Sequence, residues 1–323
     1  MVPVTIWTNH NFDAPQLDRL RKETSAHRLI ISPRTSKSNL DAGDRDLSAL
    51  DADILYGQPD IQDILASPVV KWVQLTSAGY TRYDKPEILN AIKAKGIAFC
   101  NASSLYDEPC VQHVVAMLLS LARALPQAAI DQQHASWNYL PLRGQSFLLR
   151  GQKVAIAGYG AIAKRVVELL TPYHLDITAF RRSVRGDENC RTLPIDQIDV
   201  HLPQAEIVMN LLPLSASTTR FFSADRIAKF RTGAVYINIG RGDTNDQDAL
   251  VASLKSGKLT HVYLDVTSPE PLPKNHALWT TPNCHITPHT AGGTFDEPNR
   301  MLEHFLGNLR RFERGEAVVD RVV

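Results

Sequence analysis

The chain has 323 residues, of which 44% are hydrophobic and 21% are charged, which is typical of globular proteins and long enough for two domains of about 150 residues each. Lys and Arg total 35 against 34 for Asp and Glu, so no strong overall field favours nucleic acid or acidic membranes as partners. No apolar run approaches the ~18 residues of a membrane span, and Met1–His10 lacks the pattern of a secretory signal. The four cysteines show neither disulfide nor metal-ligand spacing, so the sequence predicts a cytoplasmic protein without a metal site.

The first hundred residues alternate short apolar runs with helical patterns. The apolar runs predict strands at Val4–Trp7, Leu29–Ile31, Ile54–Tyr56, Trp72–Leu75 and Ile97–Cys100. The helical patterns predict helices at Pro15–Glu23, Ile61–Leu65 and Pro86–Lys95. Strands that alternate with helices indicate a parallel sheet that is covered by helices on both faces.

Residues 101–150 interrupt this alternation. Asn101–Asp107 has no regular pattern, and Pro109 is expected to open a long apolar helix that ends near Leu125. Within that helix, His113 is interpreted as an ordinary helix histidine rather than a ligand. The more polar segment Pro126–Arg150 carries aromatic residues without clear periodicity.

A second alternating series begins at Lys153. Strands are predicted at Lys153–Ala157, Asp176–Phe180, Ile207–Leu211, Ala234–Ile239, His261–Asp265 and His285–Thr287. A series of this length is what a complete dinucleotide-binding sheet contains. After it, the segment from Thr294 to Glu297 fits a capping box and is expected to open a terminal helix that runs to about Arg314.

The run Val154–Ala163 is the most informative stretch of the chain. An apolar strand leads directly into a Gly-x-Gly-x-x-Ala turn, and a helix-forming segment follows. In a dinucleotide-binding unit, Gly158 would make the tight turn and Gly160 would let the backbone approach a pyrophosphate, while the small third residue would allow close helix packing. The helix then presents free N–H groups to the phosphates. The run therefore predicts a dinucleotide site.

Three polar side chains follow strands of the second series. Arg241 follows the strand that ends at Ile239, Glu270 comes shortly after Asp265, and His289 follows the last strand. Ligand sites in open parallel sheets lie beyond the carboxyl ends of the strands, so we expect these side chains to gather there. A guanidinium binds a carboxylate through paired hydrogen bonds, and an imidazole beside a carboxylate transfers a proton near neutral pH. The set suits hydride transfer to a ketone.

These residues and motifs resemble those of the D-isomer-specific 2-hydroxyacid dehydrogenases. The strongest stretches are Gly158–Ala163, Leu212-Pro213-Leu214, Asn238–Gly242, Leu264-Asp265-Val266 with Glu270-Pro271-Leu272, and Thr287–Gly293. The resemblance implies two doubly wound parallel-sheet α/β domains. A Rossmann dinucleotide-binding domain would span 102–291, and a flavodoxin-like substrate domain would combine 1–101 with 292–323. It also implies a homodimer through residues 109–150.

The resemblance further assigns roles to single residues. It implies that Arg241, Glu270 and His289 are catalytic, and that the substrate is bound by Ser77, Ala78, Gly79 and Arg241. The implied cofactor contacts are Gly158, Tyr159, Gly160, Ala161, Ile162, Arg181, Arg182, Ser183, Leu212, Pro213, Thr218, Ile239, Gly240, Arg241, Asp265, His289 and Gly292. The implied reaction moves a hydride between a nicotinamide cofactor and the C2 carbonyl of a small 2-oxo acid, which gives a D-2-hydroxy acid.

One departure from the family pattern concerns the choice of cofactor. Members that prefer NAD often carry an acidic residue at the end of the second strand, where it accepts a hydrogen bond from the adenosine ribose. This chain has Arg181, Arg182 and Ser183 there. Guanidinium groups pair with phosphate oxygens and cannot accept from a hydroxyl. NADP is therefore the expected cofactor and NAD the alternative, unless both arginines are merely solvated at the sheet edge.

Two other functions stay open from the sequence. The same fold serves transcriptional corepressors, so an NAD(P)-sensing interaction protein without significant turnover is one alternative. Formate oxidation, in the same superfamily, is disfavoured because its members carry glutamine where this chain has Glu270. The presence of Arg241, Glu270 and His289 together favours the enzyme.

Overall fold

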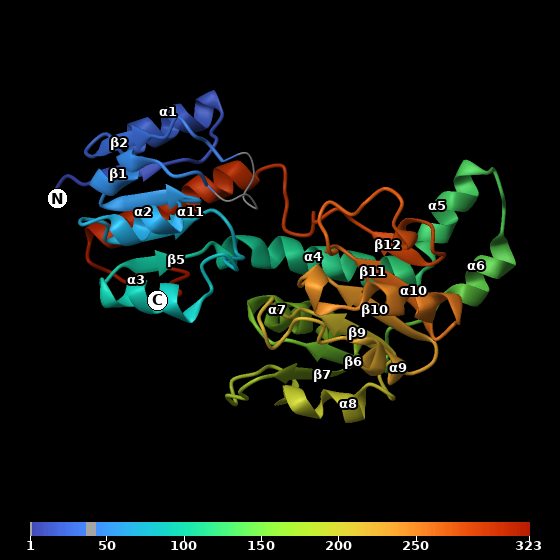
Figure 1. The fold of residues 1–323 in the computed structure, drawn as a ribbon. Coiled ribbons are helices and arrows are strands. Elements are labelled where there is room, and N and C mark those ends of the chain that lie inside the picture. The colour runs from blue at the N-terminus through green and yellow to red at the C-terminus, as the bar shows by residue number, and fades with distance from the viewer. Residues whose placement is uncertain (1, 37–42) are drawn as a thin grey trace. The chain divides into compact units, whose positions relative to one another are not determined.

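A computed structural model describes residues 2–36 and 43–323. Its contacts divide the chain into two compact units, Met1–Tyr106 with Gly293–Val323 and Asp107–Gly292. Each unit is built on a parallel sheet with helices on both faces, which confirms the predicted α/β fold class (Figure 1). The roles expected for 1–101 with 292–323, and for 102–291, stay predictions, because contacts define compact units and not their ligands.

The described residues of the first unit form a five-stranded sheet in the order β2-β1-β3-β4-β5. This is the strand order of flavodoxin-like folds. All neighbouring strands are parallel, with bounds β1 (Thr5–Thr8), β2 (Arg28–Ile31), β3 (Ile54–Gly57), β4 (Trp72–Leu75) and β5 (Ala98–Cys100).

Successive side chains of a strand point to opposite faces of the sheet, so alternate residues of these strands belong to two separate apolar cores. On one face, Tyr56 and Trp72 pack against helices α1 (Ala14–Glu23) and α11 (Glu297–Glu313). The ring of Tyr56 stacks on Phe305 of α11, with 4.1 Å between ring centroids. Helices α2 (Ile61–Ala66) and α3 (Pro86–Ala94) supply the core of the other face.

The second unit contains a seven-stranded parallel sheet in the order β12-β11-β10-β9-β6-β7-β8. The order reverses between β6 and β9, which is the switch point where ligands bind in such sheets. The strand bounds are β6 (Lys153–Ala157), β7 (Asp176–Arg181), β8 (Arg191–Pro194), β9 (Ile207–Asn210), β10 (Ala234–Asn238), β11 (Leu259–Leu264) and β12 (Cys284–Ile286).

Both faces of this sheet are buried, and neighbouring residues of one strand serve opposite faces. Val154 and Ile156 of β6 pack with helices α4 (Ser103–Ala122) and α7 (Ala161–Leu170). Ala155 belongs to the opposite core, which is completed by α8 (Ile198–His201), α9 (Ala224–Ala228) and α10 (Gln247–Lys255). The near-continuous apolar strands of the sequence are explained by this double coverage.

The helix expected to open at Pro109 begins earlier, and that prediction is wrong. Helix α4 starts at Ser103 and contains Pro109. Proline has no N–H to offer the carbonyl four residues before it, and here the carbonyl of Leu105 accepts a hydrogen bond from Arg300 Nη2 instead, at 2.6 Å. Because a side chain distant in sequence repairs this loss, the sequence pattern alone places the helix start too late.

Several elements were absent from the sequence prediction. Strand β8 is short, polar and at the sheet edge, so it lacks the apolar signal of a buried strand. The segment after α4 forms α5 (Leu125–Gln133) and α6 (Tyr139–Gln145), which have no clear apolar face.

The capping box expected at Thr294 does not form. Asp296 precedes α11 without a side-chain cap, and the hydroxyl of Thr294 accepts from Arg300 Nη1 at 3.2 Å. The prediction failed because the helix begins at Glu297 and puts Asp296, not Thr294, at the N-cap, and because the Glu297 carboxylate accepts from the Tyr106 hydroxyl.

Among residues 2–36 and 43–323, no single helix is long and apolar enough to cross a membrane. Helices α4 and α5, which meet at a bend of 68°, reach that length and composition only when they are taken together. In the same described residues, no three His, Cys, Asp or Glu side chains lie close enough to hold a metal ion.

Candidate active site

The residues predicted for catalysis and cofactor binding in the second unit lie at the carboxyl ends of its strands. They follow β6, β7, β9, β10, β11 and β12 in the order of the chain. Since every strand runs in the same direction, these loops share one edge of the sheet. That edge is where the fold places ligands.

The turn after β6 suits a pyrophosphate group. Gly158 has φ +96°, and a Cβ there would lie 2.9 Å from the carbonyl oxygen of Leu211, so the position requires glycine. Gly160 is the N-cap of α7 and supplies no side-chain cap. The first amides of the helix, at Ala161 and Ile162, are therefore available to an anion.

The predicted ribose end of the site holds an ion pair that the sequence did not indicate. Arg181 Nη1 donates to Glu188 Oε1 at 2.8 Å, and the Arg181 guanidinium lies 5.5 Å from the centre of the Tyr159 ring. Glu188 also accepts from two backbone amides of its own loop, and these contacts help lower its pKa to about 2. Arg182 and Ser183 are exposed, and no described side chain pairs with them.

The loop after β9 is held by its own side chains. Thr218 Oγ1 donates to the carbonyl of Pro213 at 2.6 Å and accepts from the amide of Ser215 at 2.7 Å. The amide of Leu212 donates to Asn210 Oδ1 at 3.1 Å. Thr218 therefore shapes the loop, and its expected contact with a cofactor stays a prediction.

Arg241 follows β10 and is held by a close backbone contact. A Cβ on Gly242 would lie 2.0 Å from the carbonyl of Thr267, so glycine is required for this approach. The guanidinium donates to the carbonyl of Gly240 at 2.6 Å, and no carboxylate of the described chain forms an ion pair with it. Burial lowers the pKa of Arg241, which Glu270 partly offsets. A half-buried cation of this kind attracts an anionic ligand.

Glu270 and His289 form a direct pair. Glu270 Oε2 and His289 Nδ1 lie 2.7 Å apart, while Glu270 Oε1 accepts from the amide of Thr267 at 2.9 Å. Burial alone would raise the pKa of Glu270, but the hydrogen bonds from His289 and Thr267 outweigh it and lower that pKa. Because an ionised carboxylate only accepts, His289 carries a proton on Nδ1. Its Nε2 has no partner among the described residues.

Asp265 anchors the loop that carries His289. Its side chain is 2% exposed and accepts from the amides of Thr290 and Ala291 at 2.9 and 3.1 Å. The backbone carbonyl of Asp265 accepts from the amide of His289 at 2.8 Å. Its expected contact with the nicotinamide is untested, but its structural role in this loop is direct.

The predicted substrate residues of the first unit lie in a loop after β4 that polar side chains hold in place. The loop is held by Gln58, whose Nε2 donates to Ser77 Oγ at 3.1 Å, and by Asn101, whose Nδ2 donates to the carbonyl of Ala78 at 2.8 Å. No described residue accepts from the amides of Ala78 and Gly79. Two free amides in a fixed loop are suited to a carboxylate.

Comparison with known proteins identifies the chain. Residues 115–291 match the family model described as D-isomer specific 2-hydroxyacid dehydrogenase, NAD binding domain. The chain belongs to this family. It is therefore a nicotinamide-dependent dehydrogenase of the 2-hydroxyacid class, which confirms the resemblance and the enzyme class predicted from the sequence.

Individual relatives agree with this assignment. A glyoxylate reductase/hydroxypyruvate reductase of Homo sapiens is 31% identical over 231 residues, which cover 71% of this chain and 70% of that protein. A glyoxylate reductase of Thermofilum pendens is 28% identical over 81% of this chain and 78% of that protein. Among solved structures, the NADPH-dependent glyoxylate/hydroxypyruvate reductase of Sinorhizobium meliloti, in complex with NADP and malonate, is similar with a TM-score of 0.77. It is 23% identical and covers 100% of this chain and 97% of that one, a likeness that shows the shared fold.

Proposed function

We propose that this chain reduces the C2 carbonyl of a small 2-oxo acid to a D-2-hydroxy acid and prefers NADPH as the reductant. The observation that carries the proposal is the Glu270–His289 pair, which leaves Nε2 of the imidazole without a partner among the described residues. Glu270 also lies close enough to Arg241 to offset in part the lowering of its pKa by burial, and that guanidinium forms no ion pair with a described carboxylate. A proton donor and a carboxylate-binding group are the two functions that reduction of a 2-oxo acid requires.

Each of these side chains has a distinct task in the proposed reaction. The planar guanidinium of Arg241 binds the substrate carboxylate and polarises the adjacent carbonyl. Glu270 accepts from Nδ1 and fixes the orientation of the ring, so His289, when doubly protonated, can deliver the Nε2 proton to the carbonyl oxygen. A nicotinamide cofactor supplies the hydride when it is bound. The amides of Ala78 and Gly79 are proposed as further contacts of the carboxylate.

An assay with purified protein tests this proposal. Glyoxylate and hydroxypyruvate, the substrates named for the relatives, should each consume NADPH at a rate proportional to enzyme concentration. A panel of larger 2-oxo acids then defines the substrate range. Binding of cofactor without turnover on any acid of the panel would instead indicate a sensing protein.

We further propose that Arg182 and Ser183 bind the 2′-phosphate of NADPH directly, and that Arg181 makes a smaller contribution. Arg181 is already paired with Glu188, whereas Arg182 is exposed at the end of β7 and has no described partner. Each charge-assisted hydrogen bond is worth about 1.5–3 kcal/mol before screening by water and salt. One good contact should therefore shift the cofactor preference by about tenfold or more.

Replacing both Arg181 and Arg182 with alanine should weaken the binding of NADPH strongly and the binding of NADH only slightly. Arg182→Ala alone should account for most of the loss, because Glu188 already neutralises Arg181. Michaelis constants for both cofactors measure the effect. Arg191→Ala is a matched control. It removes the same charge from β8, where Arg191 pairs with Thr178 of β7 and not with Arg181. Equal or better efficiency of the unmodified protein with NADH would show that the phosphate assignment is wrong.

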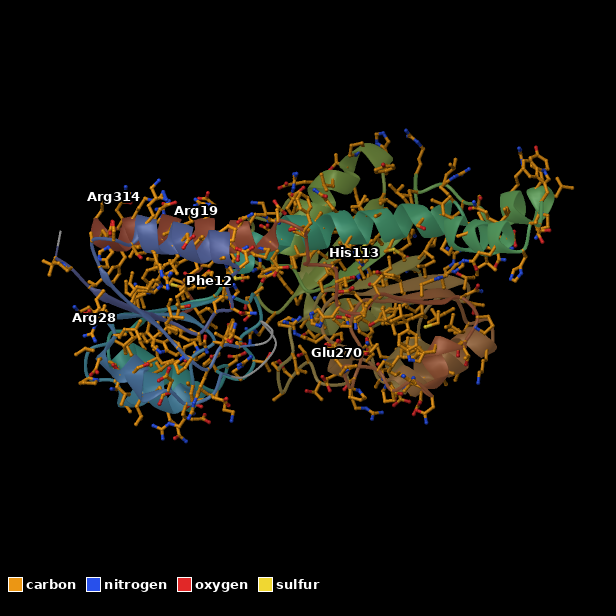
Figure 2. All side chains as sticks on the ribbon, turned by 90° about the horizontal axis from the view of Figure 1, so that it is seen from above. Phe12, Arg19, Arg28, His113, Glu270 and Arg314 are labelled. Atoms are coloured by element: carbon orange, nitrogen blue, oxygen red, sulfur yellow. The ribbon has the colours of Figure 1, made fainter. Side chains whose placement is uncertain are left out.

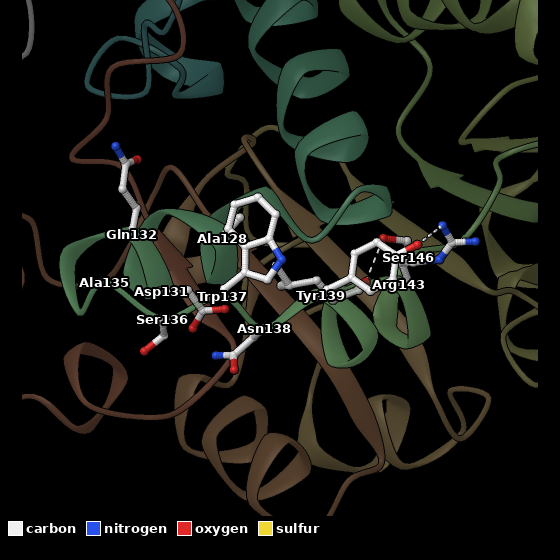
Figure 3. A pocket seen from close by; sticks show the side chains of 11 residues that line it. Ala128, Asp131, Gln132, Ala135, Ser136, Trp137, Asn138, Tyr139, Arg143 and Ser146 are labelled. Carbon is white, nitrogen blue, oxygen red and sulfur yellow. Dashed lines mark hydrogen bonds between the residues drawn. The ribbon is translucent and has the colours of Figure 1, made fainter.

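The homodimer through residues 109–150 is also proposed for this chain. Helices α5 and α6 and the turn between them line a surface hollow of about 550 Å³ (Figure 3). Trp137 there is 92% exposed and Leu140 is 72% exposed. Asp131 lines the same hollow. Its Oδ1 accepts from Gln127 Nε2 at 2.9 Å, whereas its buried Oδ2 has no hydrogen-bond partner among the described residues. Exposed apolar side chains near a carboxylate with one unsatisfied oxygen are typical of a surface that a partner covers.

Leu140→Asp should split the dimer, because it places a charge within an apolar contact. Sedimentation should then give 35.9 kDa in place of about twice that mass for the unmodified chain at micromolar concentration. Val200→Asp is the control, since Val200 is 70% exposed in the same unit but lies outside 109–150. A monomeric unmodified chain would refute this interface.

A further inference from the structure

We infer that His113 is a positioning residue, which aligns the His289 loop through a chain of hydrogen bonds. The sequence indicated only an ordinary helix histidine. The structure instead connects His113 on α4 through the hydroxyls of Tyr263 and Thr287 to the carboxylate of Asp265. Figure 2 shows His113 on the long helix α4 and Glu270 among the loops beyond the sheet. The inference rests on the proposed role of His289 in proton transfer.

The direction of every bond in this chain follows from its acidic end. The ionised carboxylate of Asp265 can only accept, so Thr287 Oγ1 must donate to it. Because the hydroxyl proton of Thr287 points to Asp265, the Thr287 oxygen must accept a hydrogen bond from the Tyr263 hydroxyl. The Tyr263 oxygen in turn accepts from Nε2 of His113. His113 therefore carries a proton on Nε2, and one arrangement satisfies all four groups.

The chain ends on the carboxylate that sets the His289 backbone. Besides the Thr287 hydroxyl, Asp265 accepts from the amides of Thr290 and Ala291, while its carbonyl accepts from the amide of His289. His289 has φ +54°, a left-handed conformation that is strained for a residue other than glycine. The loop keeps this conformation because Asp265 accepts from several of its donors at once. The orientation of Asp265 thus decides where the imidazole lies.

His113 is close enough to act on this anchor and is not a mere surface residue. Its Nε2 lies 3.2 Å from Thr287 Oγ1 and 3.7 Å from Asp265 Oδ1, and its side chain is 21% exposed. Burial raises the pKa of Tyr263, so the phenol keeps its proton as the relay requires. Low-dielectric surroundings strengthen such linked hydrogen bonds and penalise a missing member.

His113→Leu and His113→Gln test the inference as a pair. Leucine removes the donor, whereas glutamine places an N–H near the position of Nε2. The leucine variant should lower kcat for the 2-oxo acid about tenfold, because small misplacements of a catalytic group cost up to about 10²-fold. The KM for the cofactor should stay within about twofold, and glutamine should restore most of kcat.

Tyr263→Phe should lower kcat to a similar extent by removing one oxygen from the middle of the chain. The double variant with His113→Leu should then be no slower than the slower single variant, because both changes break one chain. Multiplying losses would mean independent packing effects and would overturn the inference. An unchanged kcat in His113→Leu, or a failure of glutamine to restore kcat, would overturn it equally. If His113→Leu does not fold, Tyr263→Phe and His113→Gln still decide the question.

His304→Leu is the matched control. His304 lies on α11 of the first unit and bonds Asp320 Oδ2 at 3.0 Å, so its loss costs a comparable hydrogen bond outside this network. The control should lower thermal stability but leave kcat unchanged. If His289→Ala itself keeps normal turnover, the proposed function fails. If His289→Ala is inactive while His113→Leu is normal, only the positioning role of His113 fails.

Discussion

Replacing His289 with alanine should lower turnover with 2-oxo acids by roughly 10²–10⁴-fold. The imidazole of His289 combines a ring nitrogen that has no partner among the described residues with a carboxylate on the other nitrogen. Without it, the carbonyl oxygen must take its proton from water. Cofactor affinity should change little, because the predicted phosphate-binding turn at Gly158 follows β6, whereas His289 follows β12. The substitution therefore leaves that turn intact. Steady-state kinetics and titration of cofactor binding measure the two effects separately.

The backbone at this position calls for its own control. Alanine at φ +54° adds strain that has nothing to do with proton transfer. His174→Ala imposes the same strain, since His174 has φ +53° and lies outside the site. It should lower stability without affecting turnover. His289→Asn, which tolerates the left-handed conformation better, should be as inactive as the alanine variant. Near wild-type turnover in either His289 variant at pH 7 would remove the residue from the mechanism.

Arg241→Lys should raise the KM for 2-oxo acids and lower kcat, with a combined loss in kcat/KM of about 10- to 100-fold. The ammonium keeps the charge but cannot reproduce the planar pair of donors that matches a carboxylate. Arg241 is half-buried and has no carboxylate partner in the described chain. The substitution should therefore weaken binding of the ligand and break no internal ion pair.

The matched variant is Arg226→Lys. Arg226 is also partly buried and donates to Asp199 at 2.6 Å, but neither Arg226 nor Asp199 is among the predicted site residues. It should alter stability only. If the unmodified chain and Arg241→Lys have equal kcat and KM, Arg241 does not bind the substrate carboxylate and is only a charged loop residue.

The fold followed from the sequence wherever burial left a strong pattern. The strands at Trp72–Leu75 and Lys153–Ala157 begin and end where the apolar runs do, because both faces of each sheet are covered and nearly every residue must be apolar. The tight turn at Gly158 could be predicted from the glycine itself, because the conformation and the close contact found there both exclude a side chain. The Glu270–His289 pair followed from strand-end positions, which parallel topology brings to one edge.

What the sequence could not predict depends on contacts between distant residues. Pro109 lies inside α4 because Arg300 satisfies the carbonyl that proline leaves free. Glu188 neutralises Arg181, although no spacing rule connects the two. His113 contacts hydroxyls on β11 and in the loop after β12 and approaches the Asp265 carboxylate, which no local pattern along α4 can reveal. In each case, a side-chain hydrogen bond to a different element decides the outcome.

Chiral analysis of the product tests the central claim most directly. Hydroxypyruvate incubated with the unmodified enzyme and NADPH should give only the D-enantiomer of the 2-hydroxy acid, and the parallel reaction with His289→Ala should give almost none in the same time. Formation of the L-enantiomer, or equal yields from the two proteins, would contradict the proposed site and its proton donor.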